Sequence, residues 1–226
     1  MSTIWLLAKG NLEAIERGEL TRDMQRQGLA EKALEVGADY MMWLDDDTIS
    51  PNFAVQWLHR ELANRPDAGV CGGIYCTKEA VPQPLVFDEI GGGPTYNWTV
   101  GEAFECKGLA TGCMMVKSSI LKDIPKPWFR DHNEAPVGQT TEYNGIQVPL
   151  AKSGGTDDLY FCQKVTDAGY KIIAHGGVLP VHVGQDGKRY TLPLDTYPCT
   201  SFDKKQAERR RENEREITGK NSETSN

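Results

Sequence analysis

Three consecutive aspartates, Asp45, Asp46 and Asp47, directly follow the apolar run 40–44, whose sequence is YMMWL. The run predicts a short buried strand with the aspartates at its C-terminal end, the edge where open α/β sheets bind their ligands. Because like charges held together repel one another, such a cluster is costly unless a cation lies with it. Mg²⁺ or Mn²⁺, bound by one or two carboxylates together with substrate phosphates, suits this chemistry. An acidic turn in solvent is the alternative interpretation.

A second acidic pair opens a later helix, at Thr156-Asp157-Asp158. Thr156 is a good N-cap residue and the two acids complement the helix dipole, so an ordinary helix start would explain all three. The functional alternative is a general base held at the helix N-terminus. Both interpretations hold together if Asp157 is structural and Asp158 points into a cleft.

Four other residues are candidates for the same site. His182 follows an apolar strand late in the chain, and histidine is an acceptable ligand for Mn²⁺. Arg26 lies on the helix before the aspartate strand, where its guanidinium either meets a phosphate or base or lies at the surface. Gly73 and Gly112 belong to pairs of small residues at strand ends, which admit a flat sugar or base, or simply allow tight packing.

Strands alternate with helices along the chain, which predicts an α/β fold with a mainly parallel sheet. Ser50 and Pro51 are expected to be the N-cap and the first residue of one helix. The long segment 81–98 is rich in Pro and Gly and is expected to be a loop or a hairpin. Strands are expected at 3–8, 40–44, 68–75, 110–116 and 171–174, and helices at 21–36, 51–64 and 156–168.

The 226 residues are enough for one domain with a real core, expected over 1–200, followed by a charged helical or disordered tail, 201–226. The net charge of −7 argues against a protein that coats nucleic acid through charge alone. No apolar run approaches the roughly 20 residues that span a bilayer, and residues 1–7 are too short for a signal peptide. The six cysteines follow neither zinc nor disulfide spacing, so we expect a reduced, cytoplasmic protein.

Taken in order, these features resemble the family 2-like glycosyltransferases of the GT-A fold. Residues 45–47 look like the family's DxD motif, and residues 156–161 (TDDLYF) look like its T/E-E-D-x-x-F/L segment. His182 is similar to the family's late histidine. The stretch 26–40 resembles the segment before DxD, with Gln27 where asparagine is usual.

The resemblance implies a GT-A-like, Rossmann-like single domain that moves a sugar from a nucleoside diphosphate sugar, such as a UDP-sugar, to a hydroxyl acceptor. Asp158, or failing that Asp157, would be the base of an inverting reaction. Mn²⁺ or Mg²⁺ would be held by Asp47 and His182, with Asp45 as a further ligand. The donor would be contacted by Arg26, Asp45, Asp46, Gly73 and Gly112.

The sequence departs from the family in the part before DxD, because only residues 1–44 precede Asp45 and the nucleotide-binding half is expected to be shortened. Small stand-alone versions look similar to phage enzymes, some of which modify hydroxylated bases in DNA. The acceptor stays open between DNA, a glycan and a small molecule. A nucleotide-sugar-binding module without turnover and a sugar-phosphate nucleotidyltransferase are the alternatives. The acidic net charge weighs against a DNA acceptor, for which the residues available to form a local basic rim are Lys78, Lys107, Lys117, Lys122, Lys126 and Arg130.

Overall fold

The computed structural model describes residues 4–8, 22–130, 140–143, 146–149 and 156–194, and the predicted tail lies outside them. Six strands of this described part form one sheet. Their order across the sheet is β1 (Ile4–Ala8), β2 (Tyr40–Leu44), β8 (Cys113–Lys117), β4 (Ala68–Gly73), β11 (Lys171–His175) and β6 (Ala103–Cys106).

Strand direction divides the sheet into two parallel pairs. β1 runs parallel to β2, and β4 runs parallel to β11. β8 lies between the pairs and runs antiparallel to both of its neighbours, and β6 runs antiparallel to β11 at one edge. The carboxyl ends of β1, β2, β4 and β11 therefore meet at one edge of a mixed sheet, which is called the carboxyl edge below. The predicted α/β class is confirmed.

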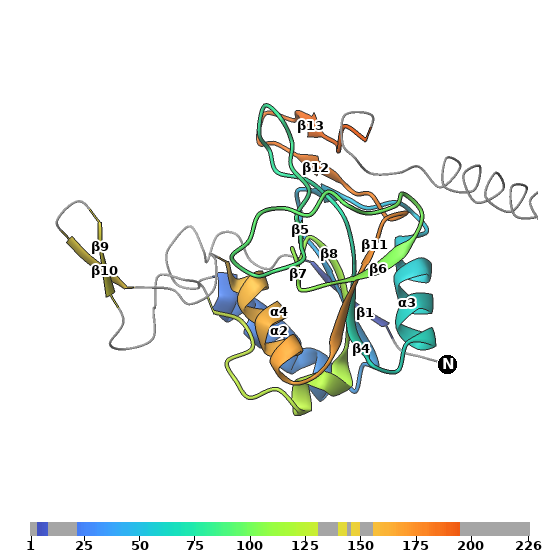
Figure 1. Cartoon of the computed structure of the whole chain (residues 1–226). Helices are drawn as coiled ribbons and strands as arrows, with labels where there is room; N and C mark the ends of the chain where they lie inside the picture. The colour runs from blue at the N-terminus through green and yellow to red at the C-terminus, as the bar shows by residue number, and fades with distance from the viewer. Residues whose placement is uncertain (1–3, 9–21, 131–139, 144–145, 150–155, 195–226) are drawn as a thin grey trace, which may run out of the picture.

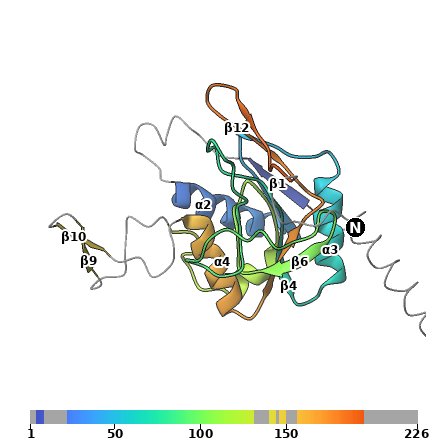
Figure 2. The ribbon, with the colours of Figure 1, turned by 45° about the horizontal axis from the view of Figure 1, so that its top comes forward.

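Helices cover both faces of the sheet. Figures 1 and 2 show α2 (Arg22–Glu35) and α4 (Asp157–Asp167) on one face and α3 (Ala54–Asn64) on the other. Because successive side chains of a strand point to opposite faces, each strand contributes to two cores.

Strand β2 shows this alternation. Met41 and Trp43 belong to the larger core with α2 and α4, while Met42 packs in the smaller core with α3. All three side chains are almost fully buried. Burial on both faces explains why the run 40–44 is continuously apolar rather than alternating.

Short elements surround the carboxyl edge. A small sheet joins β3 (Thr48–Ile49), β12 (Val181–Val183) and β13 (Arg189–Tyr190), and β12 and β13 stand above the main sheet in Figure 1. The remaining described elements are β5 (Val86–Phe87), which pairs with β7 (Gly108–Leu109), the 3₁₀ helix Ser118–Lys122, and the hairpin β9 (Thr140–Tyr143) with β10 (Ile146–Pro149).

One helix boundary was predicted wrongly. The helix expected from Pro51 begins at Ala54, with Phe53 as its N-cap residue. The Ser50 hydroxyl lies 3.5 Å from the Cys113 sulfur instead of capping the helix. Ser50 therefore ties the turn after β3 to the start of β8.

Two predictions from composition concern the rest of the described chain. The cysteines resolved there, Cys71, Cys76, Cys106, Cys113 and Cys162, are buried free thiols. Among the described helices, none combines the length and apolar character needed to cross a bilayer.

Candidate active site

A cleft with a volume of about 580 Å³ opens at the carboxyl edge. This volume is within the range of pockets that bind small molecules. Its walls come from α2, the end of β2, the segment after β4, β5, the start of α4, and β12. The lining residues are Arg22, Arg26, Asp45, Asp47, Tyr75, Lys78, Leu85, Phe87, Gly91, Gly92, Ala110, Thr156, Asp157, Asp158, Leu159 and His182.

The three aspartates form a turn that sends two of them into the cleft. The Thr48 N–H donates to the Asp45 carbonyl at 3.1 Å, which closes a four-residue turn, and the Asp45 N–H donates to the Gly112 carbonyl at 3.2 Å. Asp45 and Asp47 line the cleft, whereas Asp46 is exposed and does not line it. A donor contact by Asp46 stays a prediction.

Arg26 lies at the centre of the carboxylates. It precedes the buried Ala30 by four residues, so it lies on the same face of α2, one turn closer to the cleft. Its Nη1 donates to Asp157 Oδ2 at 2.6 Å, and its Nη2 donates to Asp45 Oδ1 at 3.4 Å. Burial lowers the pKa of Arg26, but the surrounding carboxylates outweigh this and hold its pKa above the usual value.

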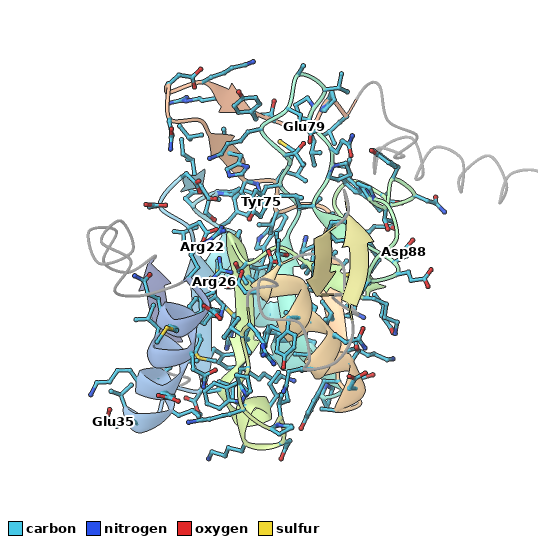
Figure 3. The ribbon with its side chains drawn as sticks, turned by 90° about the vertical axis from the view of Figure 1, so that its left-hand side faces the viewer. Arg22, Arg26, Glu35, Tyr75, Glu79 and Asp88 are labelled. Atoms are coloured by element: carbon cyan, nitrogen blue, oxygen red, sulfur yellow. The ribbon has the colours of Figure 1, made fainter. Side chains whose placement is uncertain are left out.

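Arg26 thus joins three elements that are distant in sequence: α2, the end of β2 and the start of α4. Its side chain is 11% exposed and that of Asp157 is 5% exposed. In Figure 3, Arg22 and Arg26 lie near Tyr75 at the end of α2 that faces the cleft, while Glu35 lies at the far end of the helix. The predicted contact of Arg26 with the nucleotide is untested, and its guanidinium binds two protein carboxylates.

The two acids at the start of α4 occupy different environments. Asp157 precedes the buried Phe161 by four residues and is itself buried against Arg26. Burial raises the pKa of Asp157, the Arg26 guanidinium opposes the rise, and Asp158 adds to it. Asp158 is partly exposed in the cleft, and its Oδ1 accepts from the Leu159 N–H at 2.8 Å and from the Thr156 hydroxyl. Both acids line the cleft, but Asp157 is the buried partner of Arg26 and Asp158 is the more exposed of the two, and their roles stay a prediction.

Strand β12 of the small sheet places His182 beside the aspartates. It is paired in register with Thr48, and the neighbouring Val183 N–H donates to the Asp47 carbonyl at 2.7 Å. The His182 Nε2 lies 3.6 Å from Asp47 Oδ2, and the Lys78 Nζ lies 2.7 Å from the same oxygen. The structure therefore brings the predicted pair of Asp47 and His182 together, although they are 135 positions apart in the sequence.

Tyr75 is a cleft residue that the sequence did not reveal. Its ring meets the His182 ring edge-on at 5.1 Å, and its oxygen accepts from the Gly112 N–H at 3.0 Å. Burial raises the pKa of Tyr75 well above its usual value, with Asp45 and Asp158 adding to the effect. Tyr75 is thus a neutral hydroxyl fixed beneath the carboxylates.

The two predicted glycines are explained by close packing. A Cβ on Gly112 would lie 2.4 Å from the Tyr75 hydroxyl oxygen, and a Cβ on Gly73 would lie 2.7 Å from Val178 Cγ1. Neither glycine is among the cleft-lining residues. The position of the two glycines in the structure therefore does not support their predicted contact with a nucleotide-sugar.

Replacing Gly112 with Ala should lower the free energy of unfolding by about 2 kcal/mol, because the new methyl group collides with a fixed, buried ring. Gly28→Ala is the matched control, since Gly28 is exposed in α2 and nothing lies within 4 Å of its added Cβ. That variant should gain about 0.5 to 1 kcal/mol from helix propensity. Urea denaturation measures both, and equal effects of the same sign would contradict the packing argument.

The cleft contains two side chains that could be ligands of a metal ion. Within the described residues, no group of three or more His, Cys, Asp or Glu side chains is close enough to hold a metal ion. Asp47 and His182 share one side of the cleft, while Asp45 binds Arg26. Two protein ligands fit a divalent ion that takes its other ligands from water and a diphosphate, as Mg²⁺ and Mn²⁺ do.

The basic residues expected to form a rim do not gather at the cleft. Lys78 is the member of that set among the described lining residues. Lys117 and Lys122 line a different hollow beside Tyr40, at the opposite end of β2. Lys126 pairs with Glu31 at 2.6 Å and Lys107 with Glu105 at 3.5 Å. Lys78 is therefore at the cleft, and the other five residues named for a basic rim are not among its described lining residues.

No protein-family model matches the chain, and no curated protein matches it either. Among solved structures the chain is similar to A197 from STIV, with 17% identity and a TM-score of 0.54 over 85% of this chain and 94% of that one. It also matches GalNAc-T7 in complex with UDP, GalNAc and Mn²⁺, with 12% identity and a TM-score of 0.47 over 85% of this chain and 38% of that one. The likeness to A197 shows a shared fold over nearly its whole length.

The cleft contains further residues that sequence reasoning missed. Arg22 precedes Arg26 by four residues, and this spacing was a visible signal for a second cleft-facing arginine. Leu85 and Phe87 come from the Pro- and Gly-rich segment, where no periodicity marked them. Lys78 was noted only as a basic residue, because nothing in the sequence indicates that its partner is Asp47.

Proposed function

We propose that the protein is a GT-A-like, metal-dependent glycosyltransferase that moves a sugar from a nucleoside diphosphate sugar to a hydroxyl acceptor. One observation carries the proposal: the aspartate turn, the acid pair and the late histidine line one cleft. These three motifs lie far apart in the sequence, at residues 45–47, 156–158 and 182. A chance grouping of unrelated polar residues would not be expected to reproduce that set.

Asp47 and His182 are the residues that would hold the divalent ion. In this proposal the ion neutralises the diphosphate of the donor and stabilises the leaving nucleoside diphosphate. Asp45, fixed by Arg26, is placed to meet the ribose or the sugar of the donor. A UDP-sugar is the donor that we propose to test first.

Asp158 is the base in the proposed reaction. It accepts the proton of the acceptor hydroxyl as the oxygen attacks the anomeric carbon, and the bond to the diphosphate breaks on the opposite side with inversion. Asp157 is less suited to this task because Arg26 occupies its Oδ2. The partly exposed position of Asp158 supports this assignment.

A binding module without turnover is the second candidate. The observation that favours it is the pair of hydrogen bonds at Asp158 Oδ1, from the Thr156 hydroxyl and the Leu159 N–H. These bonds are those of a carboxylate that caps its own helix. Donor binding without release of nucleoside diphosphate would support the module and exclude the enzyme.

Part of the cleft is apolar. Leu85, Phe87, Ala110 and Leu159 line it, and aromatic and aliphatic faces of this kind pack against sugars and other flat rings. We propose a glycan or a small hydroxylated molecule as the acceptor. A hydroxylated DNA base has less support, because five of the six residues named for a basic rim are not among the described lining residues of the cleft.

Asp47→Ala tests the metal and donor assignment. Wild-type protein should be stabilised against heat by UDP or a UDP-sugar with Mn²⁺ but not with chelator, by about 2.7 kcal/mol at a ligand concentration of 100 times the dissociation constant. The variant should lose the Mn²⁺-dependent part, because it lacks the carboxylate expected to bind the ion. Asp186→Ala, in the turn after β12, is the control. Unchanged Mn²⁺-dependent stabilisation in Asp47→Ala would contradict the metal assignment.

A further inference from the structure

The Lys78 ammonium group is in contact with the carboxylate oxygen that is expected to bind the metal. Its Nζ lies 2.7 Å from Asp47 Oδ2, and the His182 Nε2 lies 3.6 Å from the same atom. The His182 Nδ1 lies 2.7 Å from the Cys76 carbonyl. Because a carbonyl only accepts hydrogen bonds, Nδ1 carries a proton, and the other ring nitrogen, Nε2, faces Asp47.

The Asp47 carboxylate is paired with a positive charge. In the described cleft, Lys78 is in contact with that oxygen and supplies the charge. Arg26 does the same for Asp45 and Asp157, so protein cations already partner three of the four carboxylates that line the cleft.

The loop that carries Lys78 has a defined shape. The Thr77 N–H donates to the Gln83 carbonyl at 2.9 Å, and the Gln83 N–H donates to the Thr77 hydroxyl at 3.0 Å. Cys76, which orients His182 through its carbonyl, is two residues from Lys78. The same short segment therefore positions both the histidine and the ammonium group at Asp47.

The Lys78 side chain is able to move away from Asp47. It is 30% exposed, and a lysine carries its charge on a flexible four-carbon stem. An ammonium group and a divalent ion at one oxygen would repel each other, so a metal that binds Asp47 Oδ2, the oxygen nearest to His182, would displace Lys78 from it. A donor diphosphate bound at that metal would offer anionic oxygens to the displaced ammonium.

We propose that Lys78 is a donor-binding residue that pairs with Asp47 until a divalent ion takes the carboxylate, and that it then moves onto the donor diphosphate. This inference rests on the proposed function. Binding of the metal ion would free Lys78 for the diphosphate, and binding of the diphosphate would draw Lys78 away from Asp47. Metal and nucleotide should bind with positive coupling, and that coupling should depend on Lys78.

Titration with Mn²⁺ tests the proposal without measuring activity. Free Mn²⁺ is followed by electron paramagnetic resonance, with and without UDP, in wild-type protein and in Lys78→Met. Without UDP, the variant should bind Mn²⁺ about tenfold more tightly, since it has lost the competing ammonium group. With UDP, the gain in Mn²⁺ affinity should be smaller in the variant than in the wild type.

Two further variants locate the effect. Lys126→Met removes a lysine with a similar ion pair, 2.6 Å from Glu31 on the surface, and should leave Mn²⁺ affinity unchanged. Asp47→Asn should abolish the Mn²⁺ site in both backgrounds.

The possible failures are distinguishable. If the wild type binds Mn²⁺ with UDP but Lys78→Met has unchanged affinity for Mn²⁺ alone, the role of Lys78 is wrong and the proposed function stands. If neither protein binds Mn²⁺ with or without UDP, the metal-dependent function is wrong and this inference is overturned with it.

Discussion

Asp158→Asn should lower turnover at least about 10²-fold while the donor still binds, because an amide does not accept the proton of the acceptor hydroxyl. Turnover is measured as release of the nucleoside diphosphate from whichever nucleotide-sugar stabilises the wild type, with water or a screened acceptor as the nucleophile. Donor affinity is measured by calorimetry on the same preparation. A fall in turnover with equal affinity assigns Asp158 to chemistry rather than to binding.

The control for this experiment lies on the same helix. Asp167→Asn changes a carboxylate at the other end of α4, which accepts from Gln163 in solvent, and should leave turnover unchanged. Turnover within a few-fold of wild type in Asp158→Asn would rule out Asp158 as the base. If Asp157→Asn remains folded, binds the donor and loses turnover instead, the choice between the two acids was wrong.

Arg26→Met should lower the free energy of unfolding by about 3 kcal/mol or more, as expected when one partner of a buried ion pair is removed. The methionine keeps most of the aliphatic stem, so the loss reports the charge. Asp157, which is 5% exposed, would be left buried without its counter-charge, and Asp45 would lose a donor. Urea denaturation of the wild type and the variant gives the difference.

A surface arginine supplies the comparison. Arg65 pairs with Glu61 one turn away on α3 and is 41% exposed, so Arg65→Met should cost less than about 1 kcal/mol. The double variant Arg26→Met, Asp157→Leu should recover part of the loss, since it removes both buried charges. Equal costs for Arg26→Met and Arg65→Met would show that the Arg26 pair is not the clamp inferred from its geometry.

The strand before the aspartates could be predicted from sequence because burial on both faces leaves an unmistakable signal. Tyr40–Leu44 was expected with the same bounds that the structure has, and the helix expected at 21–36 is observed at Arg22–Glu35. Strand direction could not be predicted. A buried strand is apolar whichever way it runs, so nothing in 110–116 indicated that β8 is antiparallel to its neighbours.

The members of the site were easier to predict than their partners. Residue type and position marked Asp47, Asp158 and His182 as candidates, and the structure places all three in one cleft. The partner of Arg26 depends on how α2 and α4 are placed on the same face of the sheet, which no local sequence pattern contains. β6 was missed for a related reason: Ala103–Cys106 is a half-exposed edge strand without a continuous apolar run.

The reversed direction of β8 has a consequence for how the protein can be altered. β8 is the strand that joins the pair β1–β2 to the strands β4, β11 and β6. Asp45 and Asp47 follow β2 on one side of β8, while Tyr75 and Lys78 follow β4 on its other side. Engineering of specificity should therefore leave β8 intact and vary the β5 wall, where a change of shape does not pull the two halves of the cleft apart.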